Sequence, residues 1–99
     1  MIVYAYDLTH RADRHEAFLA AIGRLQQALD TLDGLAGTRL LDNLSRPCSY
    51  RFEESWLSAE AHDQQSGRID KGLFAALLET LSEKPARETL QLVTSQGAP

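Results

Sequence analysis

The stretch of sequence that decides the fold is Tyr50-Arg51-Phe52-Glu53-Glu54-Ser55-Trp56-Leu57-Ser58-Ala59-Glu60-Ala61. Its first seven residues alternate, which places four of them on one face of a predicted strand: Tyr50, Phe52, Glu54 and Trp56. Ser58 then ends the strand and can cap a helix, with Glu60 in the favourable first turn. Glu54 is the anomaly, because a carboxylate on an aromatic face needs a partner, a proton or a pocket that contains water.

Length and composition fit one domain spanning residues 1–99. A chain this short buries only about two-thirds of its unfolded surface, so a partner subunit would help a modest core. The composition is ordinary for a globular protein, with 43% hydrophobic and 24% charged residues. The net charge is −4 and the basic residues are scattered. This balance argues against nucleic acid or an anionic membrane as the main partner.

Cysteine content and the N-terminal residues indicate a compartment. Cys48 is the only cysteine, so an internal disulfide is impossible, which fits a reducing cytoplasm. The N-terminus has no basic region followed by a long apolar run, so we expect no signal peptide. No apolar run approaches the roughly 20 residues that a membrane span needs. We therefore expect a cytoplasmic protein without a membrane partner.

The first half of the chain predicts a strand, a helix and a hairpin. Residues 2–8 alternate, with Ile2, Tyr4, Tyr6 and Leu8 on one face of an inner strand. Asp13 and Glu16 have capping-box spacing before an amphipathic helix that ends at Asp33-Gly34. Residues 35–43 form a second strand, in which Gly37 indicates a bulge or a close approach. Residues 44–48 are a short turn, so the strand over 49–56 pairs back antiparallel.

The second half predicts two further helices and a strand. The helix capped by Ser58 runs to about Gln65 and is interrupted at Ser66-Gly67. Asp70 can cap the next helix, and Pro85 closes that helical region. We assign four residues of this helix to the core: Leu73, Phe74, Leu77 and Leu78. Residues 89–95 read as the last strand, followed by a frayed tail from Gln96 to Pro99.

The order strand, helix, strand, strand, helix, strand predicts an α+β fold, the ferredoxin-like βαββαβ arrangement with a four-stranded antiparallel sheet and helices on one face. The residues assigned to the other face are Val3, Ala5, Asp7, Arg51, Glu53, Ser55, Gln91 and Val93. This surface is too apolar to face water and too polar for a core. We therefore expect a homodimer that forms through the two sheet faces.

The whole chain resembles the antibiotic biosynthesis monooxygenase (ABM) domain family of small dimeric α/β barrels. Besides the order of elements, the first helix contains Glu16-Ala17-Phe18, the second strand contains a Gly and the hairpin contains a Pro. The most specific part is Phe52-Glu53-Glu54-Ser55-Trp56-Leu57-Ser58-Ala59-Glu60-Ala61. It is similar to the family pattern of an aromatic residue, Glu, any residue, Trp, any residue, Ser, any residue, Glu and Ala.

The resemblance implies a homodimeric barrel with a pocket in each subunit between sheet and helices. Some members of the family oxidise polycyclic phenols to quinones with dioxygen and without metal or flavin, and relatives degrade haem or isomerise small metabolites. Many members have a His nine or ten residues after the Trp, where this chain has Gln65 and Ser66. Haem-degrading members have an Asn on the first strand, where this chain has Tyr6 and Asp7. Both differences weaken the haem interpretation.

Two interpretations remain open for each residue of the central motif. Glu54 is either paired with an Arg, such as Arg39 or Arg68, or is a pocket carboxylate whose raised pKa suits proton transfer. Trp56 is either core or a pocket wall whose N–H holds a substrate oxygen.

The tyrosines and histidines have the same ambiguity. Tyr4, Tyr6 and Tyr50 either fill the layer between sheet and helices or, with Phe52 and Trp56, position a substrate. His62 follows Trp56 on the next helix and is the second candidate base. We expect His10 and His15 to be solvated. The sequence has no metal-ligand spacing, Gly-rich phosphate loop or nucleophile elbow, so we expect no metal, flavin or haem cofactor.

The first functional hypothesis is a cofactor-independent monooxygenase that oxidises a small aromatic or enolisable compound with dioxygen. Glu54 or His62 would take the proton, and the resulting anion would react with dioxygen in a dry pocket. The alternatives are a small-metabolite isomerase on the same scaffold and a non-catalytic ligand-binding dimer.

Overall fold

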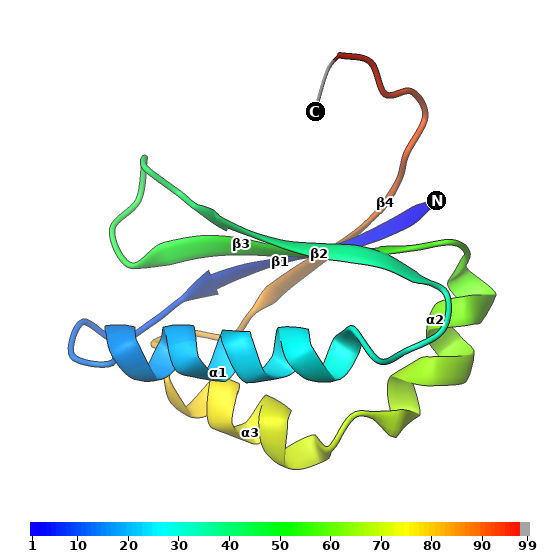
Figure 1. The fold of residues 1–99 in the computed structure, drawn as a ribbon. Helices are drawn as coiled ribbons and strands as arrows, with labels where there is room; N and C mark the ends of the chain where they lie inside the picture. The colour runs from blue at the N-terminus through cyan, green and yellow to red at the C-terminus, as the bar shows by residue number, and fades with distance from the viewer. Residues whose placement is uncertain (98–99) are drawn as a thin grey trace.

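The strand with the alternating aromatic residues, β3 (Ser49–Trp56), lies inside a four-stranded antiparallel sheet of order β2-β3-β1-β4. The computed structural model describes residues 1–97. The other elements are β1 (Ile2–Thr9), α1 (His15–Leu29), β2 (Leu35–Asp42), α2 (Ala59–Gln65), the 3-10 turn η1 (Ser66–Arg68), α3 (Lys71–Glu79) and β4 (Ala86–Gln91). Helices α1 and α3 cover one face of the sheet, and α2 stands at one end of it (Figure 1). The ferredoxin-like βαββαβ prediction is confirmed.

The core lies between the sheet and the two covering helices. Trp56 and Phe18 are completely buried, and the alternation along β3 brings Phe52 inward beside them. The other buried apolar residues of this layer are Tyr4, Leu8, Ala21, Ile22, Leu25, Leu29, Ile69, Leu77 and Leu81. The period-two pattern of β1 and the helical period of α1 therefore converge on one apolar layer.

Two of the three predicted helix caps form. The Ser58 hydroxyl accepts from the Ala61 N–H, and the Asp70 carboxylate accepts from the Gly72 N–H. The predicted Asp13 cap is wrong. The N–H of Arg14 instead donates to the carbonyl of Arg11 and closes a turn. The helix begins after this turn, where the N–H of Phe18 donates to the carbonyl of Arg14.

Helix α1 also ends earlier than Asp33-Gly34. Its last residue is Leu29, and Asp30 is the C-cap. The Thr31 hydroxyl donates to the Ala28 carbonyl at 2.7 Å, which occupies an acceptor at the helix end. A short irregular connection then leads to β2.

Strand β2 contains the bulge that its glycine indicates. Leu35 pairs with Trp56 and Gly37 pairs with Ser55, so Ala36 is the extra residue. The bulge bends the first part of β2 where β3 ends. It therefore helps shape the sheet next to Trp56.

Gly34 gives a direct test of this corner. Its φ is +84°, and a Cβ there would lie 2.6 Å from the Cβ of Ala61 in α2. Gly34→Ala is therefore expected to lower the free energy of unfolding by about 1–3 kcal/mol, because backbone strain and a clash act together. Denaturant unfolding measures this loss.

Gly23→Ala is the matched control, because a Cβ added at this position of α1 would have no heavy atom within 4 Å. This change should stabilise the protein by about 0.5–1 kcal/mol through helix propensity. Equal effects of the two substitutions would contradict the packing of Gly34 against α2.

The predicted position of the last strand is wrong. We expected 89–95, but β4 covers Ala86–Gln91, because β1 supplies partners only from Asp7, opposite Ala86, to Ile2, opposite Gln91. The ladder also changes which residues lie on the outer face. Gln91 falls on the helix side, and Val93 lies beyond the strand. The β4 residues on the outer face are Ala86, Glu88 and Leu90. The predicted fraying of residues 96–99 concerns a tail whose last two positions lie outside the described residues.

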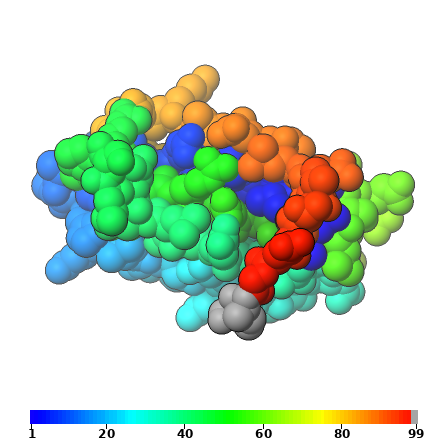
Figure 2. Space-filling view, turned by 90° about the horizontal axis from the view of Figure 1, so that it is seen from above, coloured from blue at the N-terminus to red at the C-terminus, as the bar shows by residue number. Residues whose placement is uncertain are grey.

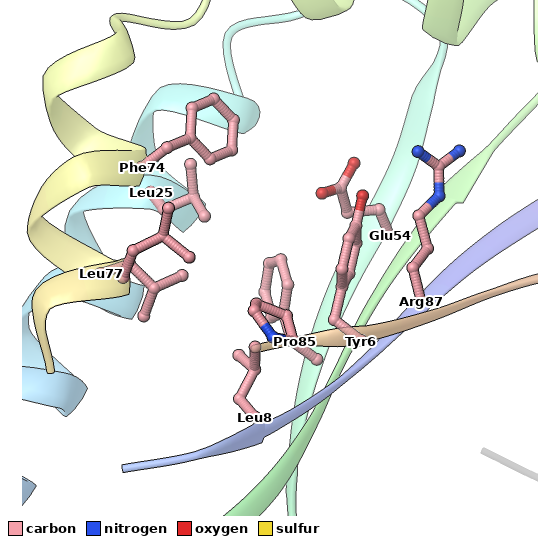
Figure 3. A pocket seen from close by; sticks show the side chains of 10 residues that line it. Tyr6, Leu8, Leu25, Glu54, Phe74, Leu77, Pro85 and Arg87 are labelled. Atoms are coloured by element: carbon pink, nitrogen blue, oxygen red, sulfur yellow. The ribbon is translucent and has the colours of Figure 1, made fainter. Parts of the chain in front are cut away.

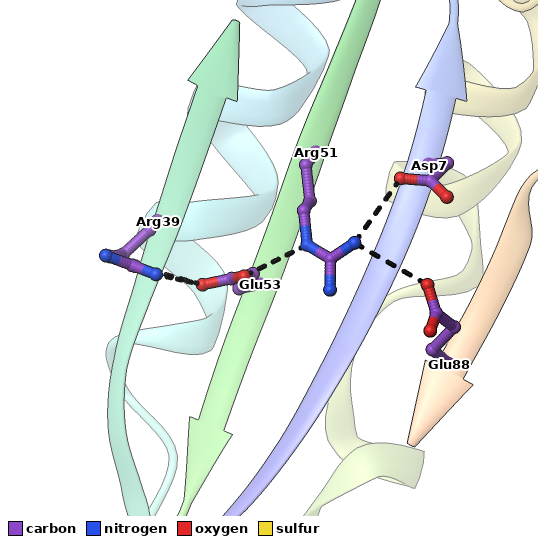
Figure 4. A network of polar contacts seen from close by, with 5 residues as sticks. All are labelled: Asp7, Arg39, Arg51, Glu53 and Glu88. Carbon is purple, nitrogen blue, oxygen red and sulfur yellow. Dashed lines mark hydrogen bonds and ion pairs between the residues drawn. The ribbon is translucent and has the colours of Figure 1, made fainter. Parts of the chain in front are cut away.

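The helices leave one face of the sheet open (Figure 2), and this face carries a chain of ion pairs (Figure 4). Arg39 Nη2 lies 2.6 Å from Glu53 Oε1, and Arg51 Nε lies 3.1 Å from Glu53 Oε2. Arg51 Nη1 continues the chain to Asp7 at 3.8 Å and to Glu88 at 3.5 Å. Burial alone would raise the pKa of Glu53, but the hydrogen bonds and charges of both arginines lower it overall. The open face is thus a structured, charged surface.

Candidate functional site

A cavity of about 190 Å³ opens between the sheet and α3 (Figure 3). Its walls are mainly apolar, and its few polar groups come from the sheet. The lining residues are Tyr6, Leu8, Leu25, Phe52, Glu54, Phe74, Leu77, Leu78, Pro85 and Arg87. Two of the four α3 residues assigned to the core, Phe74 and Leu78, are 39% and 52% exposed. That part of the prediction is wrong, because the cavity occupies the space that these side chains would otherwise fill.

Glu54 points inward, as the period-two pattern of β3 requires, and is only 5% exposed. The indole N–H of Trp56 donates to Glu54 Oε1 at 3.0 Å. Burial raises the pKa of the Glu54 carboxyl, and this effect outweighs the lowering by the Trp56 hydrogen bond and by the charges of His62 and Arg87. Glu54 is therefore a buried carboxyl that takes up a proton more readily than an ordinary glutamate.

Neither arginine proposed as a structural partner of Glu54 has that role. Arg39 lies opposite Glu53 in the ladder, and its guanidinium binds Glu53 on the outer face. Within residues 1–97, Arg68 forms no ion pair with Glu54 either. The hydrogen-bond partner of Glu54 is a neutral indole, which favours the pocket-carboxylate interpretation.

Tyr6 stands next to Glu54 in the cavity wall (Figure 3). Burial raises the pKa of its phenol, the Glu54 charge raises it further, and the Arg87 charge partly opposes both. Tyr6 therefore stays protonated at neutral pH and can donate a hydrogen bond. The predicted site residue Phe52 supplies part of the apolar wall beside Tyr6, with ring centroids 6.4 Å apart.

Arg87 is a cavity residue that the sequence did not reveal. It lies opposite Tyr6 in the β1–β4 ladder, and its guanidinium lies 4.4 Å from the Tyr4 ring centroid. The incorrect start of the last strand at residue 89 left Arg87 in a connecting segment. The alternation Arg87, Thr89, Gln91 beside an inner strand was the only signal that could have assigned it to the inner face.

Trp56, Tyr4 and His62 form a second layer beside Glu54 and do not line the cavity. The His62 ring lies 4.3 Å from the Tyr4 ring and meets the Trp56 ring edge-on at 5.3 Å. Its Nδ1 is 3.1 Å from Asp63 Oδ1. Because Trp56 is completely buried, it fits the core interpretation while also holding Glu54. His62 acts on the cavity through its charge, which lowers the pKa of Glu54.

Tyr50 is placed at the other end of β3, away from Glu54. Its hydroxyl lies 3.0 Å from His15 Nε2. Its ring packs against His10 and Phe18, at the edge of a separate open groove beside the β2–β3 hairpin. The expectation that His10 is solvated is wrong: it is 5% exposed, because Phe18 covers its ring and Nδ1–H donates to the Arg11 carbonyl at 2.7 Å. His15 is exposed, as expected.

Two further observations concern cofactors and membranes. Within residues 1–97, no three His, Cys, Asp or Glu side chains are grouped so that they could hold a metal ion. None of the helices in this part of the chain combines the length and the apolar character that crossing a membrane requires.

Comparisons with known proteins place the fold. No protein-family model matches the sequence, and no protein of curated function matches it either. Solved structures match over nearly the whole chain, and several of them are antibiotic biosynthesis monooxygenases by name. The chain therefore has the fold of the antibiotic biosynthesis monooxygenase proteins, as the sequence resemblance implied.

Three of these structures show the extent of the likeness. A candidate antibiotic biosynthesis monooxygenase from Nitrosomonas europaea has a TM-score of 0.84 at 12% identity, covering 95% of this chain and all of that one. Another from Caulobacter crescentus CB15 has a TM-score of 0.84 at 21% identity, covering 94% and 90%. SnoaB from Streptomyces nogalater, a cofactor-independent oxygenase solved as a point mutant, has a TM-score of 0.81 at 14% identity, covering 95% and 94%.

Proposed function

We propose that the protein is a member of the antibiotic biosynthesis monooxygenase family and a cofactor-independent monooxygenase that oxidises a small aromatic or enolisable compound with dioxygen. The observation that supports this most is Glu54, a buried carboxyl with a raised pKa in the wall of an apolar cavity. A base in a water-poor cavity suits proton abstraction from a phenol or enol. The fold and the oxygenase activity in the name of SnoaB agree with this proposal.

The proposed reaction begins when Glu54 takes the proton of the substrate hydroxyl. The anion then transfers one electron to dioxygen, and the resulting radical and superoxide combine into a peroxide bond at carbon. Cleavage of the O–O bond leaves one oxygen on the substrate as a carbonyl. The other oxygen leaves as water, with the proton held by Glu54 and the proton lost from carbon. The apolar walls hold the substrate and keep bulk water away, and the Tyr6 hydroxyl can donate to the anion.

Oxygen consumption tests this proposal. Purified protein, without added cofactor and in the presence of a chelator, is incubated with phenols and enolisable ketones while dissolved oxygen is recorded. The proposal expects oxygen uptake in a one-to-one ratio with substrate loss for at least one compound. Conversion without oxygen uptake would instead identify the isomerase alternative, which the pairing of a base, Glu54, with a neutral acid, Tyr6, also supports. Binding without conversion would favour the non-catalytic alternative.

The open face of the sheet supports a homodimer in this proposal. One row across the ladder contains Arg39, Glu53, Ala5 and Glu88, in that order from β2 to β4. A two-fold axis parallel to the strands places β2 of one copy over β4 of the other, at the same level of the row. Arg39 would then meet Glu88 of the second copy, and both side chains are more than half exposed. The chain that follows β4 leaves the sheet on this side as well (Figures 1 and 2), and it begins with the exposed residues Leu92 and Val93.

The dimer is expected to bury on the order of 2,000 Å² or more. Arg39→Glu should weaken it at least about tenfold through like-charge repulsion, and Arg39→Glu combined with Glu88→Arg should restore it. Sedimentation equilibrium measures these constants. Arg24→Glu, on the exposed surface of α1, is the control and should leave assembly unchanged. A wild-type monomer at micromolar concentration would overturn the proposal.

A further inference from the structure

Arg87 gives the cavity a positive charge at the side where the sheet ends. It belongs to the edge strand β4 and shares its face with Tyr6 (Figure 3). Its guanidinium lies 4.4 Å from the Tyr4 ring and 6.0 Å from the Tyr6 ring, so aromatic side chains support it. Among residues 1–97, no carboxylate forms an ion pair with it. A cation that aromatic rings support in a cavity wall, and that forms no ion pair with a carboxylate of residues 1–97, suits an anionic ligand.

The volume of the cavity limits the rest of that ligand. It measures about 190 Å³. A cavity of about 150 Å³ holds one benzene molecule, and pockets for drug-sized ligands start near 300 Å³. The walls between Phe52 and Leu77 therefore enclose one aromatic ring with small substituents, whereas three fused rings would extend beyond them.

We propose that the cavity selects a single-ring aromatic acid that carries an acidic hydroxyl, and that Arg87 is the specificity-determining residue. The ring occupies the apolar space, the carboxylate pairs with Arg87, and the hydroxyl faces Glu54. The role of the hydroxyl rests on the proposed function, whereas the selection of a small carboxylate rests on the cavity and Arg87 alone. Arg87 is not a catalytic residue in this proposal, because it contacts the carboxylate and not the reacting atoms.

Trp56 supplies the means to test this. It is the only tryptophan of the chain, and its indole N–H bonds to Glu54 in the cavity wall. One indole cross-peak in a ¹⁵N–¹H spectrum thus reports on ligands that reach Glu54. The probes are 4-hydroxybenzoate, its uncharged methyl ester and anthracene-2-carboxylate, which keeps the carboxylate but has three rings.

The wild-type protein should bind 4-hydroxybenzoate at least about tenfold more tightly than the ester and than the three-ring acid. Arg87→Gln should raise the Kd of 4-hydroxybenzoate about 10- to 100-fold, as expected for loss of a charged hydrogen bond, and change that of the ester less than about threefold. Arg87→Lys keeps the charge and should retain part of the preference. Arg24→Gln, which removes the same charge from the exposed surface of α1, should change neither constant.

Arg87 is exposed on an edge strand, so its variants should fold, and thermal unfolding verifies this. The inference is overturned if the ester binds as tightly as the acid, if Arg87→Gln weakens both probes equally, or if the three-ring acid binds best. Arg87-dependent binding of the small acid without oxygen uptake supports this inference and contradicts the proposed oxygenase. Oxygen uptake only with neutral or polycyclic phenols supports the proposed oxygenase and contradicts this inference.

Discussion

Trp56→Ala is expected to lower the free energy of unfolding by about 3–5 kcal/mol. The indole is completely buried, so the substitution leaves a large cavity between the sheet and the helices. It also removes the indole N–H that donates a hydrogen bond to Glu54, so the buried carboxyl loses that donor. Chemical denaturation at neutral pH, with the slope of the transition compared between variants, measures the loss.

The neighbouring residue supplies the control. Leu57 is 66% exposed, so Leu57→Ala should change stability by less than about 0.5 kcal/mol. A small loss for Trp56→Ala together with a large loss of ligand binding would show that the indole lines an open pocket. A small loss with unchanged binding would contradict both its packing and its contact with Glu54.

The parts of the fold that the sequence predicted correctly depend on local periodicity. The alternation along β3 fixes the inward direction of Glu54, because Phe52 and Trp56 cannot both be buried with Glu54 outside unless a bulge intervenes. The bulge is on the neighbouring strand, at Ala36, and therefore does not disturb this register. The caps at Ser58 and Asp70 also follow from contacts within one turn of helix.

The incorrect predictions depend on partners distant in the sequence. The position of β4 follows from the length of β1, at the opposite end of the chain, and Arg87 was overlooked for that reason. His10 appeared to be a loop residue, but α1 places Phe18 over its ring. Phe74 has the spacing of a core residue on α3, yet it borders the cavity, because a helical pattern cannot show where the facing layer is empty.

Glu54→Gln should fold at least as stably as the wild-type protein at neutral pH. Had the partner been a buried arginine, the loss of the carboxylate would be strongly destabilising. The partner is the Trp56 N–H, which can still donate a hydrogen bond to the side-chain oxygen of a glutamine. The pKa of the folded-state carboxyl is raised above its ordinary value of 4.5, so the unfolded chain loses its proton first as pH rises. The contribution of Glu54 to wild-type stability therefore falls as the pH rises from about 4.5 to the raised pKa of the folded state. Above that pKa the contribution is constant.

The free energy of unfolding of Glu54→Gln minus that of the wild-type protein should consequently be near zero in acid. It should grow as the pH rises from about 4.5 to the raised pKa of Glu54. Urea unfolding at a series of pH values checks it. Glu53→Gln is the matched control on the opposite face of the sheet, where the ion pairs with Arg39 and Arg51 lower the carboxyl pKa. The stability difference for Glu53→Gln should have the opposite sign, because the wild-type protein gains stability from an ionised Glu53 above the ordinary pKa and loses this stability in acid. The same pH trend of stability in both variants would contradict the assignment of a raised pKa to Glu54 and a lowered pKa to Glu53.

The same Glu54→Gln substitution should lower the rate of substrate oxidation by about 10²- to 10⁴-fold, the range for losing a general acid or base. The wild-type kcat/KM should rise with pH through the raised pKa of Glu54, since only the ionised carboxylate accepts a proton, and this ascending limb should disappear in the variant.

His62→Gln tests the other candidate base. His62 lies outside the cavity lining and lowers the pKa of Glu54 through its charge, so its loss should move the ascending limb to higher pH and leave the plateau rate within about tenfold. A Glu54→Gln variant that is stable, binds ligand and retains full oxidation would exclude Glu54 as the base. A collapse of the plateau in His62→Gln alone would assign that role to His62.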